Sequence, residues 1–202
     1  MSAKRMQYSI VVPVYNSADI VEELVNQVKS VMKARGYSFE LILVDDGSID
    51  TVWKKITGLA ATHSFIRGLR LSNNFGQWMA TTAGMSRARG EHIITMDDDL
   101  EYDPADIITL IENYSKGDYY LIFGLAKDKY RLQGKPSLIA LWRSRLVNVI
   151  WQKFLTDSFK LFSRELVFDE DKFIPNVHFE AFVNVTLAPS HVGYCEHAFI
   201  TG

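Results

Sequence analysis

Short apolar runs alternate with longer amphipathic segments along the first 125 residues of the chain. Strict alternation of strands and helices is typical of a mostly parallel sheet that is covered by helices on both faces. The pattern therefore predicts a Rossmann-like α/β fold. The apolar runs that we expect to form buried strands are 8–14, 39–44, 66–71, 92–96 and 119–124. The segments with helical spacing between them are 20–36, around 52–59, 77–88 and 104–114.

The pattern changes after Gly124, where a polar, basic loop at 125–136 precedes an amphipathic segment at 137–155. The broad apolar face of this segment favours a helix that packs on the core. The alternative is a helix at a membrane surface, with Trp142 and Trp151 as interfacial anchors. The remaining elements that we expect are a helix around 178–187 and strands at 191–196 and 198–201.

Composition narrows the class of protein. Hydrophobic residues make up 48% of the 202 residues and charged residues 23%, which is an ordinary globular balance. A formal net charge of −2 provides no basic field for nucleic acid, so we expect no nucleic-acid partner. We also expect no signal peptide and no transmembrane segment. The single Cys195 fits a reducing compartment, and we expect a cytoplasmic protein.

Polar clusters directly follow the first four predicted strands: YNSAD, DDGS, NNFGQ and DDDLEYD. Any one of them is explained by turns and helix caps, and Ser17 and Ser48 need no other role. The carboxyl ends of parallel strands, however, meet at one edge of the sheet, where ligands bind. Four clusters at equivalent positions therefore predict one polar crevice.

The fourth cluster places five carboxylates in seven residues: Asp97, Asp98, Asp99, Glu101 and Asp103. Two carboxylates ~5 Å apart repel by about 3 kcal/mol at an effective dielectric constant of ~20. Such crowding requires good solvation or a neutralising cation. Asp97 and Asp99 share one face of an extended chain, Glu101 joins them if the extended geometry persists, and Asp98 points elsewhere. Oxygen ligands favour Mg²⁺, Mn²⁺ or Ca²⁺ over zinc.

Other phosphate-binding signatures are absent from the sequence. It contains no G-x-x-x-x-G-K-[ST] motif, and PVYNSA stands after the first strand where a glycine-rich loop would bind a dinucleotide. A bound phosphate group would therefore be held by a metal ion and by charged side chains.

The segments SIVVPVYNS, LILVDDGSIDT, NFGQWMATTAGMSRARGEHIITMDDDLEYDP and DSFKLFSREL resemble, in order and spacing, glycosyltransferase family 2, which has the GT-A fold. The resemblance is closest to the subgroup of dolichol-phosphate mannosyltransferase and the polyprenyl-phosphate sugar transferases. It implies an inverting hexosyltransferase that uses Mg²⁺ or Mn²⁺. This enzyme would move a sugar from a nucleotide-diphospho-sugar to a polyprenyl phosphate, or to a glycan hydroxyl, in cell-surface polysaccharide synthesis.

The resemblance also implies how the chain is organised. Residues 1–125 form the half of one catalytic domain that binds the nucleotide sugar and carries the D-x-D metal motif. Residues 126–202 form the acceptor-side half. A peripheral contact with the inner face of the membrane is consistent with a lipid acceptor.

The resemblance assigns roles to individual residues. Asp46 would accept hydrogen bonds from the base, Asp45 would support the turn, and Asp97, Asp98 and Asp99 match the D-x-D element. The residues expected to bind the nucleotide sugar are Pro13, Tyr15, Asn16, Asp45, Asp46, Asn74, Gly76, Gln77 and Asp98. The expected metal ligands are Asp97, Asp99 and Glu101, and the expected catalytic residues are Asp97, Asp99 and Glu180.

Glu180 would act as a general base if the acceptor is a hydroxyl, whereas a lipid phosphate requires no base. The competing interpretation of Glu180 is a solvated helix residue.

The chain departs from the family pattern at several positions. Ser17 stands where members of the subgroup often have Glu, and Ala126 stands where they often have Arg. Arg164 matches a recurrent family arginine that we interpret as structural. Members continue towards membrane helices where this sequence stops, so we expect it to be part of a longer protein.

Two other functions remain open from the sequence. A nucleotidyltransferase that forms sugar nucleotides would require a glycine-rich phosphate loop. A non-catalytic module that binds nucleotide sugars would be expected to lose metal ligands that this chain retains.

Overall fold

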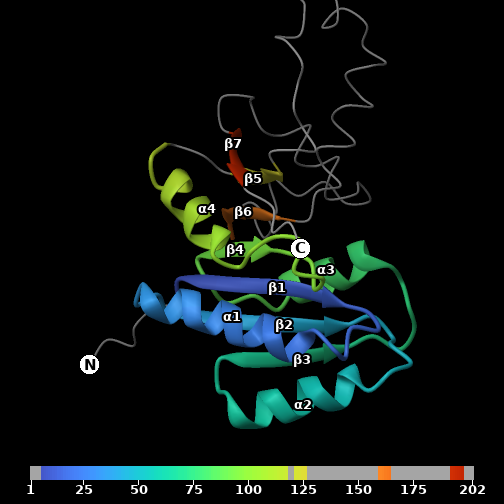
Figure 1. Cartoon of the computed structure of the whole chain (residues 1–202). Helices are drawn as coiled ribbons and strands as arrows, with labels where there is room; N and C mark the ends of the chain where they lie inside the picture. The colour runs from blue at the N-terminus through green and yellow to red at the C-terminus, as the bar shows by residue number, and fades with distance from the viewer. Residues whose placement is uncertain (1–5, 118–120, 127–158, 165–191, 198–202) are drawn as a thin grey trace, which may run out of the picture.

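The computed structural model describes residues 6–117, 121–126, 159–164 and 192–197 (Figure 1). The strands are β1 (Tyr8–Val14), β2 (Phe39–Asp45), β3 (Ile66–Arg70), β4 (His92–Thr95), β5 (Leu121–Ala126), β6 (Lys160–Ser163) and β7 (Val192–His197). The helices are α1 (Val21–Ala34), α2 (Val52–Thr62), α3 (Gln77–Met85) and α4 (Asp106–Tyr114). No helix within these ranges is long and apolar enough to cross a membrane.

The strands form one seven-stranded sheet in the order β3-β2-β1-β4-β6-β5-β7. β1 pairs in parallel with β2 and β4, β2 pairs in parallel with β3, and β5 pairs in parallel with β7. The predicted α/β class with a mostly parallel sheet is confirmed. The strand expected at 191–196 corresponds to β7.

β6 was not predicted, and it runs antiparallel between β4 and β5. Only Leu161 and Phe162 are apolar in its four residues, so no two-residue period is recognisable. The predicted helices at 137–155 and 178–187, the strand at 198–201 and most of the basic loop fall outside the described residues.

The two faces of the sheet carry separate apolar clusters. In β1 and β2 every residue except Tyr8 is buried, and successive side chains point to opposite faces. Ile10, Val12 and Leu41 pack against α1, α2 and α4 on one face, where α1 crosses in front of the sheet (Figure 1). Val11 and Ile42 pack against α3 on the other face. Burial on both faces explains why these strands read as continuous apolar runs.

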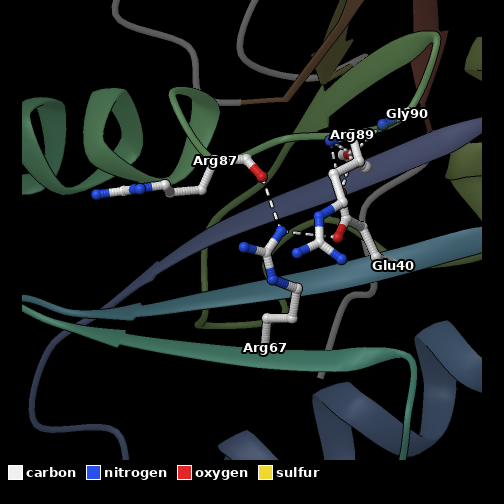
Figure 2. Close-up of polar contacts among 6 residues, drawn as sticks. Glu40, Arg67, Arg87, Arg89 and Gly90 are labelled. Atoms are coloured by element: carbon white, nitrogen blue, oxygen red, sulfur yellow. Dashed lines mark hydrogen bonds and ion pairs between the residues drawn. The ribbon is translucent and has the colours of Figure 1, made fainter.

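An ion pair between the buried Glu40 and the partly exposed Arg67 ties the turn after α3 to the amino end of the sheet (Figure 2). Glu40 is only 3% exposed, and its Oε1 accepts hydrogen bonds from the Ser9 hydroxyl and the Arg89 N–H, both at 2.7 Å. Its Oε2 accepts a hydrogen bond from Arg67 Nη1 at 3.0 Å, and the same nitrogen donates to the Arg87 carbonyl at 2.7 Å. The buried carboxylate is therefore well satisfied, as burial of a charge requires.

Gly84 allows α3 to lie close to the sheet. A Cβ at this position would be 2.4 Å from Val11 Cγ1 and 2.9 Å from Val44 Cγ2. Both valines are fully buried, so neither side chain has space to move aside. The fit matters for function because α3 begins at Gln77, one of the predicted donor-site residues.

We expect Gly84→Ala to lower the free energy of unfolding by about 1–3 kcal/mol through overpacking. Gly58→Ala is the matched control: Gly58 lies inside α2, and a Cβ there meets nothing within 4 Å. This control should raise the free energy of unfolding by about 0.5–1 kcal/mol through helix propensity. Urea denaturation measures both changes, and equal effects of the two substitutions would contradict the close packing of α3.

Candidate active site

The parallel register brings three strand ends to one edge of the sheet. Val14 at the end of β1 pairs with Asp45 at the end of β2, and Val11 pairs with Thr95 at the end of β4. The segments that follow are called here loop 1 (15–20), loop 2 (46–51), loop 3 (71–76, after β3) and loop 4 (96–105). Strand ends, loops and the start of α3 enclose a cleft of about 320 Å³ that is lined by Pro13, Val14, Tyr15, Asp46, Asn74, Gly76, Gln77, Asp97, Asp98 and Asp99.

Nine of the predicted site residues thus lie around one cleft, and Val14 is the single lining residue that was not predicted. Asn16, Asp45 and Glu101 were predicted for the site but do not line the cleft. Glu180 lies outside the described residues.

Asp45, the last residue of β2, bonds to the turn of loop 2. Its side chain is fully buried, and its Oδ1 accepts a hydrogen bond from the Ser48 N–H at 2.8 Å. Its Oδ2 lies 3.0 Å from Arg70 Nε, in an ion pair whose alignment is too poor for a good hydrogen bond. The Arg70 guanidinium also lies over the Trp53 ring, 5.7 Å from its centroid. Asp45 therefore bonds to the turn of loop 2 and does not line the cleft.

Asn16 links loop 1 to loop 2. Its φ of 55° is in the left-handed region, which Asn adopts more readily than most residues. Its N–H donates to Ser48 Oγ at 3.0 Å, and its Oδ1 accepts a hydrogen bond from the Ile49 N–H at 3.0 Å. The Asn16 backbone N–H and side-chain oxygen thus both bond to loop 2, and Asn16 does not line the cleft.

Asp46 holds loop 3 beside loop 2. It is only 2% exposed, yet it lines the cleft, and its Oδ1 accepts a hydrogen bond from the Phe75 N–H at 2.8 Å. A carboxylate accepts about four hydrogen bonds, so this contact leaves acceptor capacity for a ligand. Within loop 3, Asn74 Oδ1 accepts a hydrogen bond from the Gly76 N–H at 3.0 Å.

The three aspartates of loop 4 are each held by a different donor. Asp97 Oδ1 accepts a short hydrogen bond from Gln77 Nε2 at the start of α3. Asp98 Oδ2 accepts hydrogen bonds from loop 1, and Asp99 Oδ1 accepts one from the Glu101 N–H at 2.9 Å. The extended geometry needed to place Glu101 beside Asp97 and Asp99 does not persist, because β4 ends at Thr95 and Leu100 has a φ of 58°.

The surroundings of Asp98 change its acidity. Burial raises the pKa of Asp98 above its ordinary value, and the neighbouring Asp99 charge raises it further. Hydrogen bonds from the Ser17 hydroxyl and the Tyr15 N–H oppose these effects and lower the pKa. The carboxylate is thus half-buried at the junction of loop 1 and loop 4.

No group of three or more carboxylate, imidazole or thiol side chains is arranged to hold a metal ion within the described part of the chain. The cleft itself presents carboxylate and amide oxygens. Mg²⁺ commonly binds through one or two carboxylates together with substrate phosphates and water. The residues present fit that mode of binding better than a metal site built from protein ligands alone.

Sequence comparison identifies the family. A sequence profile of glycosyl transferase family 2 matches residues 9–168. The chain belongs to glycosyltransferase family 2. This family member is 34% identical to an undecaprenyl-phosphate 4-deoxy-4-formamido-L-arabinose transferase of Pseudomonas paraeruginosa. The aligned region of 146 residues covers 72% of this chain and 41% of the relative. It is 36% identical over 125 residues to a dodecaprenyl-phosphate galacturonate synthase of Rhizobium johnstonii, covering 61% of this chain and 37% of the relative.

The chain thus spans about two fifths of the length of these curated relatives. Solved structures share its GT-A fold. A mannosyltransferase from Pyrobaculum calidifontis in complex with GDP-Man and Mn²⁺ superimposes with a TM-score of 0.65 at 16% identity, covering 96% of this chain and 57% of that one. TarS 1–349 of S. aureus in complex with UDP gives a TM-score of 0.65 at 18% identity, covering 96% and 60%.

Sequence reasoning missed the role of Ser17. A serine shortly before a helix is explained by capping, but the N-cap residue of α1 is Ile20, which makes no side-chain capping bond. The Ser17 hydroxyl instead donates to Asp98, 81 positions away. No local pattern indicates a contact of this range.

Gly47 lets loop 2 lie against loop 3. Its φ is +70°, and a Cβ there would be 2.4 Å from the Asn73 carbonyl carbon and 2.6 Å from the Asn74 nitrogen. Gly36 has a similar φ of +68°, but a Cβ at that position meets nothing within 4 Å. The two glycines therefore separate the cost of backbone conformation from the cost of a steric clash.

We expect Gly36→Ala to lower the free energy of unfolding by about 1 kcal/mol, through the left-handed conformation alone. Gly47→Ala should lower it by about 2–4 kcal/mol, because the clash with backbone atoms adds to that cost. Urea denaturation measures both values. Equal losses for the two variants would show that the contact between loops 2 and 3 does not constrain the chain.

Proposed function

We propose that this chain carries the catalytic domain of an inverting, divalent-metal-dependent glycosyltransferase that moves a sugar from a nucleotide-diphospho-sugar to a polyprenyl phosphate. The single observation that carries the proposal is the shared cleft, in which Asp97, Asp98 and Asp99 lie around the same space as Tyr15 and Asp46. In a family 2 transferase this arrangement suits a donor whose base lies by loops 1 and 2 and whose diphosphate lies by loop 4.

The described residues support binding of the nucleotide in several ways. Pro13 and the half-exposed Tyr15 ring provide apolar surface for a base, and Asp46 offers a buried carboxylate oxygen to a base N–H. Asn74 and Gly76, on loop 3, line the same cleft. The solved structures bound to UDP and to GDP-Man have the same fold, which is consistent with a nucleotide-sugar donor.

A metal ion would be held by Asp97 and Asp99, which are the outer members of the D-x-D element. When bound, a divalent ion stabilises the negative charge that builds on a departing nucleoside diphosphate. Gln77 orients Asp97 through its side-chain amide, and the Glu101 N–H orients Asp99. These donors hold the two carboxylates before any ligand arrives, which lowers the cost of ordering them on binding.

The acceptor is proposed from the named relatives, which act on undecaprenyl phosphate and dodecaprenyl phosphate. A phosphate oxygen is already anionic, so attack on the sugar requires no proton removal by the protein. A glycan hydroxyl would require a general base, for which Glu180 remains the predicted residue.

Calorimetric titration with UDP, GDP and dTDP tests donor and metal together. At least one nucleotide should bind about tenfold more tightly in Mn²⁺ than in EDTA, because Asp97 and Asp99 would hold an ion whose charge favours the diphosphate. In Asp99→Asn, Mn²⁺ should no longer raise nucleotide affinity by about tenfold or more, and the affinity measured in EDTA should equal that of wild type.

Asp103→Asn is the matched control, since Asp103 lies in the same segment but its Oδ1 accepts the Ala105 N–H at 2.8 Å, which an asparagine oxygen also does. In this variant, Mn²⁺ should raise nucleotide affinity as much as in wild type.

Transfer of labelled sugar from the matching nucleotide sugar to undecaprenyl phosphate then tests turnover. Binding of nucleotide that is indifferent to Mn²⁺ and to Asp99 would refute metal dependence, and binding without transfer to any acceptor would favour a non-catalytic module.

A further inference from the structure

Loop 1 and loop 4 meet at a single carboxylate oxygen. Asp98 Oδ2 accepts a hydrogen bond from the Tyr15 N–H at 3.1 Å and a short one from the Ser17 hydroxyl. The two donors lie 83 and 81 positions from Asp98 along the chain, so only the folded sheet brings them together. We name this contact the loop 1–loop 4 latch; it consists of Tyr15, Ser17 and Asp98.

The rest of loop 1 is held by loop 2. The Asn16 N–H donates to Ser48 Oγ at 3.0 Å, and the Ala18 N–H donates to Asp50 Oδ2 at 2.9 Å. The Asn16 N–H belongs to the peptide unit on the C-terminal side of Tyr15, whereas the Tyr15 N–H, on its other side, is directed to Asp98. The latch therefore restrains the N-terminal side of Tyr15 at the cleft wall, and loop 2 restrains its C-terminal side.

Tyr15 is the aromatic residue of the cleft lining, and it is 46% exposed. An aromatic ring at the wall of a nucleotide cleft stacks on a base, and such stacking contributes about 1–3 kcal/mol in single-stranded nucleic-acid sites. Stacking depends on the placement of the ring plane, which follows the backbone that carries it. A change in the latch should therefore alter the contact with the base.

We propose that Ser17 is a positioning residue for the nucleotide: its hydroxyl orients Asp98, and Asp98 in turn fixes Tyr15 against the base. Ser17 is the member of the latch whose contribution can be removed cleanly, because the Tyr15 donor is a backbone N–H and Asp98 adjoins two expected metal ligands. The inference rests on the proposed function, because it requires a nucleotide in the cleft.

The experiment is calorimetric titration of the purified chain in EDTA, with whichever of UDP, GDP and dTDP the wild-type protein binds. Ser17→Ala should weaken nucleotide affinity about five- to tenfold, the size of one ordinary intramolecular hydrogen bond. Ser17→Thr keeps a hydroxyl and should restore affinity to within about twofold of wild type.

Two controls separate positioning from general stability. Ser115→Ala removes a comparable hydroxyl, which donates to the Ile111 carbonyl at 2.8 Å near the end of α4, and should leave nucleotide affinity unchanged. Titration of Mn²⁺ alone should give the same affinity for Ser17→Ala as for wild type, because Asp97 and Asp99 keep their own donors.

The outcomes are distinguishable. Unchanged nucleotide affinity in Ser17→Ala, or no recovery in Ser17→Thr, overturns the role of Ser17. Parallel losses of Mn²⁺ affinity, nucleotide affinity and melting temperature in Ser17→Ala also overturn it, since they indicate a general structural effect. Failure of the wild-type chain to bind any of the three nucleotides, with or without Mn²⁺, would refute the proposed function itself.

Discussion

The structure depends on the burial of β1 between two parallel neighbours. Its edges are paired with β2 and β4, and its faces are covered by two separate apolar clusters. A slip of one residue would exchange the side chains of the two faces, so packing on both sides fixes the register. Because of that register, β1 and β2 end side by side, with Val14 paired to Asp45. The position of the cleft is thus a consequence of packing in the core.

Contacts between the loops then give the cleft its shape. Asn16 joins loop 1 to loop 2, Asp46 joins loop 2 to loop 3, and Asp98 joins loop 4 to loop 1. Each of these residues has a type that is typical of ligand binding, yet each also bonds to a neighbouring loop. Polar side chains at these strand ends therefore hold the loops together, because backbone groups at a contact between loops need hydrogen-bond partners.

Loop 4 shows how a fold accommodates crowded carboxylates. Three adjacent aspartates accept hydrogen bonds from α3, from loop 1 and from their own loop, so four donors stabilise their charges. Burial still disfavours the charge of Asp98, and Asp99 remains exposed. Carboxylates in this condition are suited to a cation that arrives with a phosphorylated ligand, which is the chemistry proposed for this family member.

The sequence by itself determined the alternation of strands and helices, the polar strand ends and nine of the residues that line the cleft. The alternation and the polar strand ends follow from local periodicity and from the rule that parallel strands end at one edge, whereas the roles of the individual donor-site residues are implied by the family resemblance. Only the tertiary structure decided that Asn16 bonds to loop 2 and that Asp45 bonds to Ser48 and Arg70. It also decided that Glu101 does not line the cleft, that β6 enters the sheet antiparallel and that Ser17 bonds to Asp98. The physical reason is that neither feature leaves a periodic signal in the sequence. The hydrogen bond joins residues 81 positions apart, the strand has only four residues, and both are selected by the surrounding packing.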